Sequence, residues 1–331
     1  MNYLIFGGEG FIGRCLASYL EENVIRSGDS VYSLDIKPRV EQGAPGKFIS
    51  CDVRVPIRLS DLTDLSESII FNLAAVHTTP GHPDKEYFET NILGANNICA
   101  FAEQNDISRI VFTSSIAPYG ASEESKTEDS LPMPNTPYGI SKLVAEYIFK
   151  TWQAKNIKSR KLSIVRPGVV FGKDEGGNFT RLYNAQKIGT FFYPGRKDTL
   201  KASVYVKDVV RILYQTITSG LPDNFCLYNL TYYPAPTIEK ICNTISEVTE
   251  VSKPKLIIPG WTLKTIAAVI YNIGAVFGMK FDGIHPQRVK KLMISTNISG
   301  EKLSRSEFKL QYDLKSAIED WKKESGGKIL E

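Results

Sequence analysis

The fold is decided by residues 3–13, which read YLIFGGEGFIG. The apolar run Tyr3–Phe6 is typical of a short buried strand, and a helical pattern begins at Phe11. Gly7, Gly10 and Gly13 lie around the connection between the two. Glycine there permits a tight turn, lets a ligand approach the backbone and allows close packing of helix on strand. The stretch therefore predicts a strand, a turn and a helix that open a parallel α/β sheet.

Such a turn also suits a dinucleotide, because the first N–H groups of a helix lack partners within it and attract phosphate. Asp35 ends the next predicted strand. A carboxylate there accepts hydrogen bonds from ribose hydroxyls and repels a 2′-phosphate, so we predict NAD as the cofactor. The alternative interpretation of Asp35 is a solvated turn residue before Pro38. Glu9 has to point away from the pyrophosphate.

Strands alternate with helices along the first half of the chain. The predicted strands are Tyr3–Phe6, Val31–Leu34, Ser68–Ala75, Ile110–Ser114 and Leu162–Arg166, and the predicted helices are Phe11–Glu22, Tyr87–Gln104 and Asn135–Lys155. This order predicts a Rossmann-type, doubly wound parallel sheet with helices on both faces. After about Gly168 the pattern becomes irregular. We expect an NAD-binding domain over 1–170, with a contribution from about 203–232, and a smaller substrate-binding part over 171–202 and 233–331.

Composition limits the classes of function. The net charge of +4 over 331 residues, without a basic run, disfavours nucleic-acid binding. Five scattered cysteines suggest reduced thiols and a cytoplasmic protein, and no signal peptide is expected. His77, His82 and His285 show no metal-ligand spacing, so no metal is predicted.

A candidate base and its cationic neighbour lie in residues 138–142, YGISK. Thr136 can cap this helix and Pro137 suits its first position. Tyr138 and Lys142 are four residues apart and so share a helix face, where the ammonium favours the phenolate and lowers the pKa of the tyrosine. The alternative is an ordinary amphipathic helix with an exposed lysine.

Hydroxyl groups follow the strand before this helix. Residues 113–120 read TSSIAPYG, and Ser114 and Ser115 would lie at the carboxyl end of the strand, where open parallel sheets bind ligands. Ser115 could hydrogen-bond the reacting oxygen and orient it toward Tyr138. A serine-rich loop is the alternative.

Taken together, these motifs resemble the extended short-chain dehydrogenases/reductases. The resemblance covers essentially the whole chain through GGEGFIG, Asp35, Asp52-Val53, NLAA at 72–75, NILG at 91–94, TSSIAPYG, YGISK and RPGVVFG at 166–172. It implies that Ser115, Tyr138 and Lys142 are the catalytic residues. It further implies that Lys142 anchors the nicotinamide ribose.

The resemblance also implies two sets of binding residues. The cofactor set is Gly7, Gly10, Phe11, Ile12, Gly13, Asp35, Asp52, Val53, Leu73, Ala74, Ala75, Asn91, Thr113, Ser114, Tyr138, Lys142, Pro167 and Val169. Within it, Asp52 and Val53 meet the adenine, and Asn91 supports the active site from a helix. The substrate set is His77, Ser115, Asn178, Lys201 and Arg288. Lys201 stands where many relatives have an arginine, so it keeps the charge but loses the bidentate fork.

Within that family the chain looks like bacterial sugar 4-epimerases of surface-polysaccharide assembly, including O-antigen. Their N-acetylglucosamine is linked through diphosphate to a nucleotide or to undecaprenol. Ile116 and Ala117 replace the Asp-Glu pair usual in dehydratases, which disfavours dehydration. The implied mechanism is transient C4 oxidation by bound NAD. The alternatives are an NAD(P)H-dependent 4-keto-sugar reductase and, from another class, a non-catalytic NAD-binding regulator.

Two further partners are expected. Family analogy implies a homodimer through the helices Tyr87–Gln104 and Gly139–Lys155. The fifteen uncharged residues Thr265–Met279 are too few to span a bilayer comfortably. The segment 257–280 could instead lie at the membrane surface, with lysines facing anionic headgroups. A buried helix is the alternative.

Overall fold

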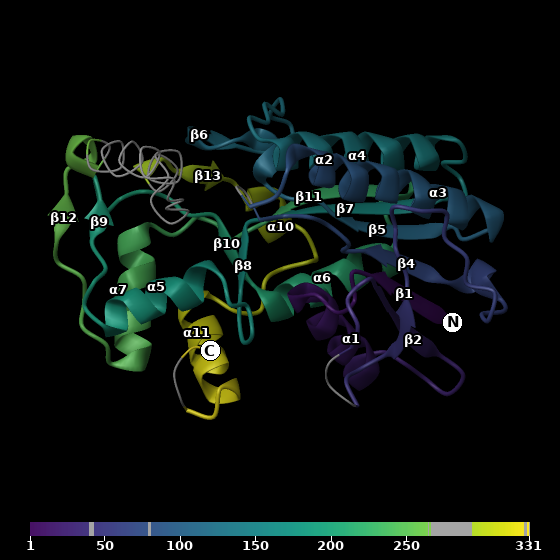
Figure 1. Cartoon of the computed structure of the whole chain (residues 1–331), viewed down its shortest axis with the longest axis horizontal. Coiled ribbons are helices and arrows are strands. Elements are labelled where there is room, and N and C mark those ends of the chain that lie inside the picture. The colour runs from purple at the N-terminus through teal and green to yellow at the C-terminus, as the bar shows by residue number, and fades with distance from the viewer. Residues whose placement is uncertain (40–42, 79–80, 264, 266–292, 328–329, 331) are drawn as a thin grey trace, which may run out of the picture.

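A seven-stranded parallel sheet forms the centre of the molecule, in the order β11-β7-β5-β4-β1-β2-β3 (Figure 1). The computed structural model describes residues 1–39, 43–78, 81–263, 265, 293–327 and 330. The strands of this sheet are β1 Asn2–Phe6, β2 Ser30–Asp35, β3 Lys47–Ser50, β4 Ile69–Asn72, β5 Arg109–Thr113, β7 Lys161–Pro167 and β11 Phe225–Leu230. The predicted Rossmann-type doubly wound fold is thus confirmed.

Alternate residues of each strand face opposite sides of the sheet, and each side has its own core. From β1, Leu4 and Phe6 enter one core, whereas Tyr3 and Ile5 enter the other. Because both faces are covered, the central strands are apolar along their length rather than at alternate positions.

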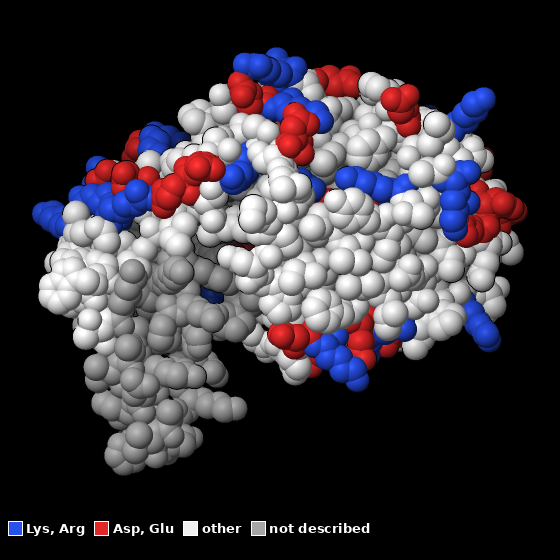
Figure 2. Space-filling model, turned by 90° about the horizontal axis from the view of Figure 1, so that it is seen from above, with Lys and Arg blue, Asp and Glu red and all other residues white. Residues whose placement is uncertain are grey.

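Helices cover both faces. The helices α1 Phe11–Asn23 and α6 Val206–Thr218 pack together over one face. The other face is covered by α3 Gly94–Gln104 and α4 Pro137–Ala154, which contribute Ile98, Phe149 and Trp152 to its core. Figure 2 shows the α3–α4 side as a broad face with few charged residues at its centre.

The smaller part lies beside the carboxyl edge of the sheet (Figure 1). Its helices are α5 Asn178–Lys187, α7 Ile238–Thr249, α10 Glu301–Ser304 and α11 Leu314–Glu324. Its strand pairs are β8 Val169–Phe171 with β10 Ser203–Tyr205, β9 Tyr193–Pro194 with β12 Ile257–Ile258, and β6 Ser122–Lys126 with β13 Thr296–Ile298. The last pair brings the C-terminal segment back to the loop that follows β5.

Several predicted boundaries were wrong. The helix predicted at Tyr87–Gln104 is α2 Asp84–Phe88, a π-helical turn Glu89–Leu93 and then α3. The chain after Gly168 is regular rather than irregular, since it contains α5, α6, β11 and α7. Arg288 and most of 257–280 lie outside the described residues. Among the helices that are described, none is both long and apolar enough to traverse a bilayer.

Candidate active site

The strand order reverses between β1 and β4, and the residues after these strands meet there. Gly7 follows β1 with a φ of +82°, a left-handed conformation that favours glycine. A Cβ at Gly7 would lie 2.6 Å from the backbone nitrogen of Ala74. The loop after β4, where Leu73 and Ala74 are predicted to contact the cofactor (the cofactor loop), is therefore packed directly against the glycine turn. A crevice at such a reversal is where open α/β sheets bind their ligands.

The glycine turn has the shape that a dinucleotide needs. A Cβ at Gly13 would lie 2.3 Å from the carbonyl oxygen of Gly7, so only glycine lets α1 start this close to β1. A Cβ at Gly10 would meet only the Gly7 oxygen, at 3.2 Å. No side chain caps the N-terminus of α1, which begins with Phe11 and Ile12. The open side of Gly10 and the uncapped helix start therefore fit a pyrophosphate.

Asp35 ends β2 beside this turn, as predicted. Its carboxylate accepts hydrogen bonds from the backbone N–H groups of Glu9, at 3.1 Å, and Lys37, at 2.9 Å. The Glu9 side chain points toward Arg39, with 2.8 Å between Oε1 and Nη2, and accepts a hydrogen bond from Ser33. Burial acts to raise the pKa of Glu9, but the bonds from Arg39 and Ser33 outweigh it and lower the pKa. Arg39 is thus already engaged, rather than offered to a 2′-phosphate.

The predicted adenine contacts lie after β3. A hydrogen bond from Arg54, at 2.7 Å from its Nη2, holds the pKa of Asp52 below its usual value. Val53 is buried, and its carbonyl accepts a hydrogen bond from Asn97 at 2.8 Å. A Cβ at Gly94 would lie 2.9 Å from the Val53 side chain, so α3 packs closely on this loop.

The proposed base lies in the first turn of α4. The predicted cap is confirmed: Thr136 Oγ1 accepts a hydrogen bond from the Gly139 N–H at 3.1 Å, and Pro137 opens the helix. The Tyr138 phenol is hydrogen-bonded to the side chain of Ser115, which follows β5. The ring of buried Tyr87 lies 6.4 Å from the Tyr138 ring, centroid to centroid. The structure therefore brings the phenol and the serine hydroxyl together.

The expected lowering of the Tyr138 pKa is wrong for the protein alone. Burial raises the pKa, and the hydrogen bond with Ser115 only partly opposes it. Burial penalises the charged phenolate, and this effect outweighs the lowering of the pKa that we expected from the Lys142 ammonium.

Lys142 is buried one helical turn further on. Its Nζ donates to the Thr113 carbonyl at 2.8 Å and lies 4.7 Å from the centroid of the Phe112 ring. Burial lowers its pKa to about 7, while the charge of Glu146 acts in the opposite direction. The Thr113 hydroxyl is buried and has no hydrogen-bond partner among the residues that the structure describes. It is a polar group available to a ligand at this edge of the sheet.

A buried network behind the lysine was missed by the sequence analysis. Arg166 donates to Glu146 at 2.5 and 2.8 Å, and Ser114 donates to the same carboxylate at 2.5 Å. Arg166 also donates to the Tyr119 hydroxyl, which in turn donates to Asn229 at 2.9 Å. The available signal was a glutamate four residues after Lys142, on the helix face that also carries Ala145, Phe149 and Trp152, together with an arginine inside a buried strand.

Asn91 lies between the cofactor loop and α4. Its Oδ1 accepts from the Val76 N–H at 3.1 Å, and its Nδ2 donates to Ser141 at 2.8 Å. It thus ties the loop after β4 to the helix that carries Tyr138 and Lys142. Its position in a π-helical turn is what aims the side chain inward.

The predicted substrate residues are placed on three different elements. His77 lies on the loop after β4, where partial burial and the Lys142 ammonium lower its pKa. Asn178 is exposed at the first position of α5. Lys201 precedes β10 and donates to the Ile294 carbonyl at 3.0 Å, and burial lowers its pKa to about 8. Pro167 and Val169 flank the turn from β7 to β8.

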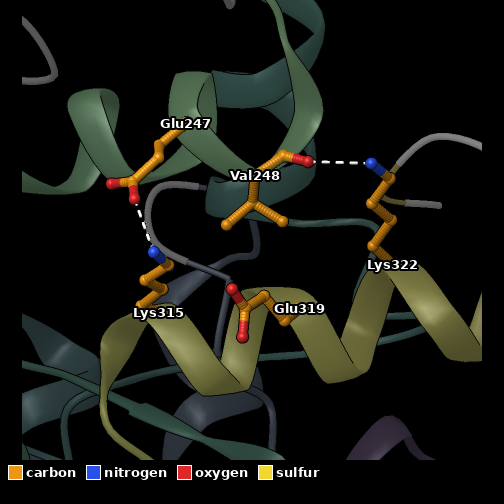
Figure 3. A pocket seen from close by; sticks show the side chains of 5 residues that line it. All are labelled: Glu247, Val248, Lys315, Glu319 and Lys322. Carbon is orange, nitrogen blue, oxygen red and sulfur yellow. Dashed lines mark hydrogen bonds and ion pairs between the residues drawn. The ribbon is translucent and has the colours of Figure 1, made fainter.

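A hollow between α7 and α11 lies away from these groups (Figure 3). Glu247 pairs with Lys315 at 2.5 Å, and Lys322 donates to the Val248 carbonyl at 2.8 Å. These polar groups satisfy one another, so the hollow is explained by the docking of α11 on α7.

Known proteins resemble the chain in sequence and fold. A family model described as the NAD dependent epimerase/dehydratase family matches residues 3–229. The N-acetyl-α-D-glucosaminyl-diphospho-ditrans,octacis-undecaprenol 4-epimerase of Escherichia coli O157:H7 is 26% identical over 96% of this chain and 93% of its own. Two Bacillus cereus structures share the fold. UDP-N-acetylglucosamine 4-epimerase has a TM-score of 0.68, 20% identity and 97% coverage of each chain. UDP-glucuronic acid 4-epimerase in complex with NAD has a TM-score of 0.69 and 19% identity, covering 98% of this chain and 99% of that one.

Proposed function

Because the chain belongs to the NAD-dependent epimerase/dehydratase family, we propose that it is a sugar 4-epimerase. Its substrate is a hexose or N-acetylhexosamine linked through diphosphate to a nucleotide or a polyprenol, used in surface-polysaccharide biosynthesis. NAD is the cofactor of the family. The observation that carries the proposal is the hydrogen bond between Tyr138 and Ser115, with Lys142 held at the end of β5 by the Thr113 carbonyl.

The chain's own residues move one proton in this reaction. Ser115 hydrogen-bonds the C4 oxygen and directs its hydroxyl toward Tyr138, which takes the proton as a general base. The Lys142 ammonium stabilises the phenolate from the next turn of the helix. The glycine turn, Asp35 and the loop at 73–75 would hold NAD⁺, which would provide the acceptor for the hydride from C4 and the source of the hydride that C4 regains. After the 4-keto sugar turns in the site, Tyr138 gives the proton back to the C4 oxygen. Because C4 also regains a hydride, the reaction has no net redox change.

The resemblance to the undecaprenol-linked epimerase over almost the whole chain supports the polyprenyl carrier, because the similarity includes the substrate-binding part. His77, Asn178, Lys201 and Arg288 are the proposed substrate contacts. The cations among them suit the diphosphate that both carriers share.

Product analysis tests this function directly. Purified protein is incubated with UDP-N-acetylglucosamine, with UDP-glucose and with polyprenyl-diphosphate-linked N-acetylglucosamine. We expect inversion at C4 with no net change in NADH absorbance. Consumption of NADH with a 4-keto sugar would instead indicate the reductase, and NAD binding without any turnover would indicate the non-catalytic regulator.

The Lys201 ammonium predicts a loss of substrate affinity at alkaline pH. With a pKa of about 8, Lys201 is charged at pH 7 and largely neutral at pH 9. We therefore expect kcat/KM to fall by about 10-fold over this range through loss of the diphosphate contact. In Lys201→Arg the guanidinium stays charged, so this part of the fall should disappear. Identical pH profiles of kcat/KM for the two proteins would contradict the assignment.

An apolar stripe on α4 supports the proposed homodimer. Ile140, Val144 and Tyr147 lie on one helix face, and Tyr147 is 57% exposed. The helix α4 belongs to the side of the molecule shown in Figure 2, whose centre has few charged residues. We expect light scattering to report a dimer for the wild type and a monomer for Tyr147→Asp, because the charge would be buried without a partner. Ile188→Asp, at an apolar residue of the smaller part that is 71% exposed, should leave the dimer intact. A monomeric wild type would contradict this proposal.

Exposed apolar residues support contact with the inner face of the cell membrane. Leu256, just before the 257–280 segment, is 60% exposed, and Trp261, near the start of that segment, is 73% exposed. Tryptophan favours the membrane interface. We expect the protein to float with anionic vesicles in a density gradient, and Trp261→Ser to float less. If wild type and variant both stayed at the bottom of the gradient, apart from the vesicles, this result would contradict the contact.

A further inference from the structure

Glu146 and Lys142 lie on the same face of α4, one turn apart, at the back of the active site. Lys142 is 2% exposed and Glu146 is fully buried. Residues from the central sheet hold the Glu146 carboxylate. Ser114, directly after β5, and Arg166, within β7, donate hydrogen bonds to it at 2.5 to 2.8 Å. The side chain is therefore held in one position by three hydrogen bonds.

The buried charges here do not balance. Two basic side chains, Lys142 and Arg166, are buried here with one carboxylate, which pairs directly with Arg166 and acts on Lys142 through its charge. A guanidinium cannot release its proton in a protein, so any deficit of negative charge falls on the lysine. If Glu146 lost its charge, Lys142 would have to become neutral or stay charged beside an unpaired guanidinium.

The other groups around the Lys142 ammonium do not supply a carboxylate. The Thr113 carbonyl and the Phe112 ring lie against it from β5, and His77 from the loop after β4. His77 would add positive charge when protonated. Within the described residues, Glu146 is the acidic group whose charge acts on the ammonium.

We propose that Glu146 is a positioning residue that keeps Lys142 charged and in place, so that the lysine can support the Tyr138 phenolate and hold the cofactor's ribose. This inference rests on the proposed function. It assigns the buried Glu146–Arg166 pair a role in the chemistry in addition to its role in the fold. Tyr119 and Asn229 extend the pair toward Ser299 of the C-terminal segment and fix the arginine.

Two variants separate this role from a merely structural one. Glu146→Gln and Arg166→Met both break the same ion pair, but they leave charges of opposite sign behind. In Glu146→Gln the alkaline limb of the pH profile of kcat/KM should shift to lower pH by ~1 pH unit or more, because the ammonium loses its counter-charge. In Arg166→Met the alkaline limb should stay where it is or shift to higher pH. A structural role alone would lower activity in both variants without moving the limb.

The same shift is measured without turnover, by titrating each protein with NADH and following nicotinamide fluorescence from pH 6 to 10. We expect affinity to weaken at a lower pH in Glu146→Gln, and Tyr119→Phe, which leaves all charges in place, to follow the wild type. If Glu146→Gln does not fold, the double variant with Arg166→Met removes the unpaired guanidinium, and its alkaline limb should lie at lower pH than that of Arg166→Met alone. A folded variant without the Glu146 carboxylate whose limb coincides with that of the matching protein that keeps the carboxylate would overturn the proposal. Absence of sugar epimerisation by the wild type would refute the proposed function. The NADH titration would still decide whether Glu146 keeps Lys142 charged.

Discussion

Replacing Tyr138 with phenylalanine is expected to lower kcat for C4 epimerisation by ~10²- to 10⁴-fold, because the proton acceptor is removed. The ring that packs near Tyr87 remains, so the melting temperature should stay close to the wild type and NADH affinity should fall far less than kcat. Both are measured on the same preparation as kcat, by thermal unfolding and by nicotinamide fluorescence.

The matched control for this variant is Tyr87→Phe. It removes a neighbouring phenol that donates to the Thr78 carbonyl, and it leaves the proton path untouched. We expect less than ~10-fold loss of kcat in this control, since only loop packing changes. Wild-type turnover by Tyr138→Phe would show that some other group accepts the proton.

Replacing Gly13 with alanine should abolish NAD binding and destabilise the fold. The new Cβ would lie 2.3 Å from the Gly7 carbonyl oxygen and 2.7 Å from the Gly8 Cα, and both atoms are backbone. Relief requires α1 to move away from β1, at a cost of ~1–3 kcal/mol or more in the free energy of unfolding. Chemical denaturation measures this cost, and calorimetry measures the loss of NAD binding.

Gly10→Ala separates the two effects of that variant. Its Cβ meets only the Gly7 oxygen, at 3.2 Å, so the stability of the apoprotein should change little. The methyl group would nevertheless project toward the proposed pyrophosphate site, and we expect NAD affinity to fall by ~100-fold. Gly220→Ala, which meets nothing within 4 Å, should match the wild type in both assays. Unchanged NAD affinity in Gly10→Ala would refute the assigned phosphate position.

The sequence predicted the fold where local and tertiary preferences agree. The glycine turn, β1, α1 and the Thr136 cap could be recognised because turn geometry and capping depend on nearby residues. β3 was missed because it is a short, half-exposed edge strand of the sheet. The helix α6 was missed although Val209, Ile212, Leu213 and Thr216 mark a buried face, because charged residues and tyrosines obscured its pattern.

The site was predictable as a set of residue types but not as an electrostatic environment. Tyr138 and Lys142 are four residues apart, so their shared face follows from helix geometry. Their pKa values depend on burial and on Glu146, which cannot be read from spacing. The Glu146–Arg166 pair joins residues twenty apart in sequence and is visible only once α4 lies across β7. Arg288 lies outside the described residues, so its role stays a prediction.

The pairing of β13 with β6 has a consequence for biosynthesis on the ribosome. The loop that carries Ser115 and Tyr119 is made in the first half of translation, yet it is flanked by Thr296–Ile298 and linked through Asn229 to the Ser299 carbonyl. The central sheet is complete once residue 230 has emerged. All strands of the central sheet therefore leave the ribosome before the loop that carries Ser115 acquires its C-terminal neighbours, so this loop is among the last parts of the molecule to reach its final surroundings.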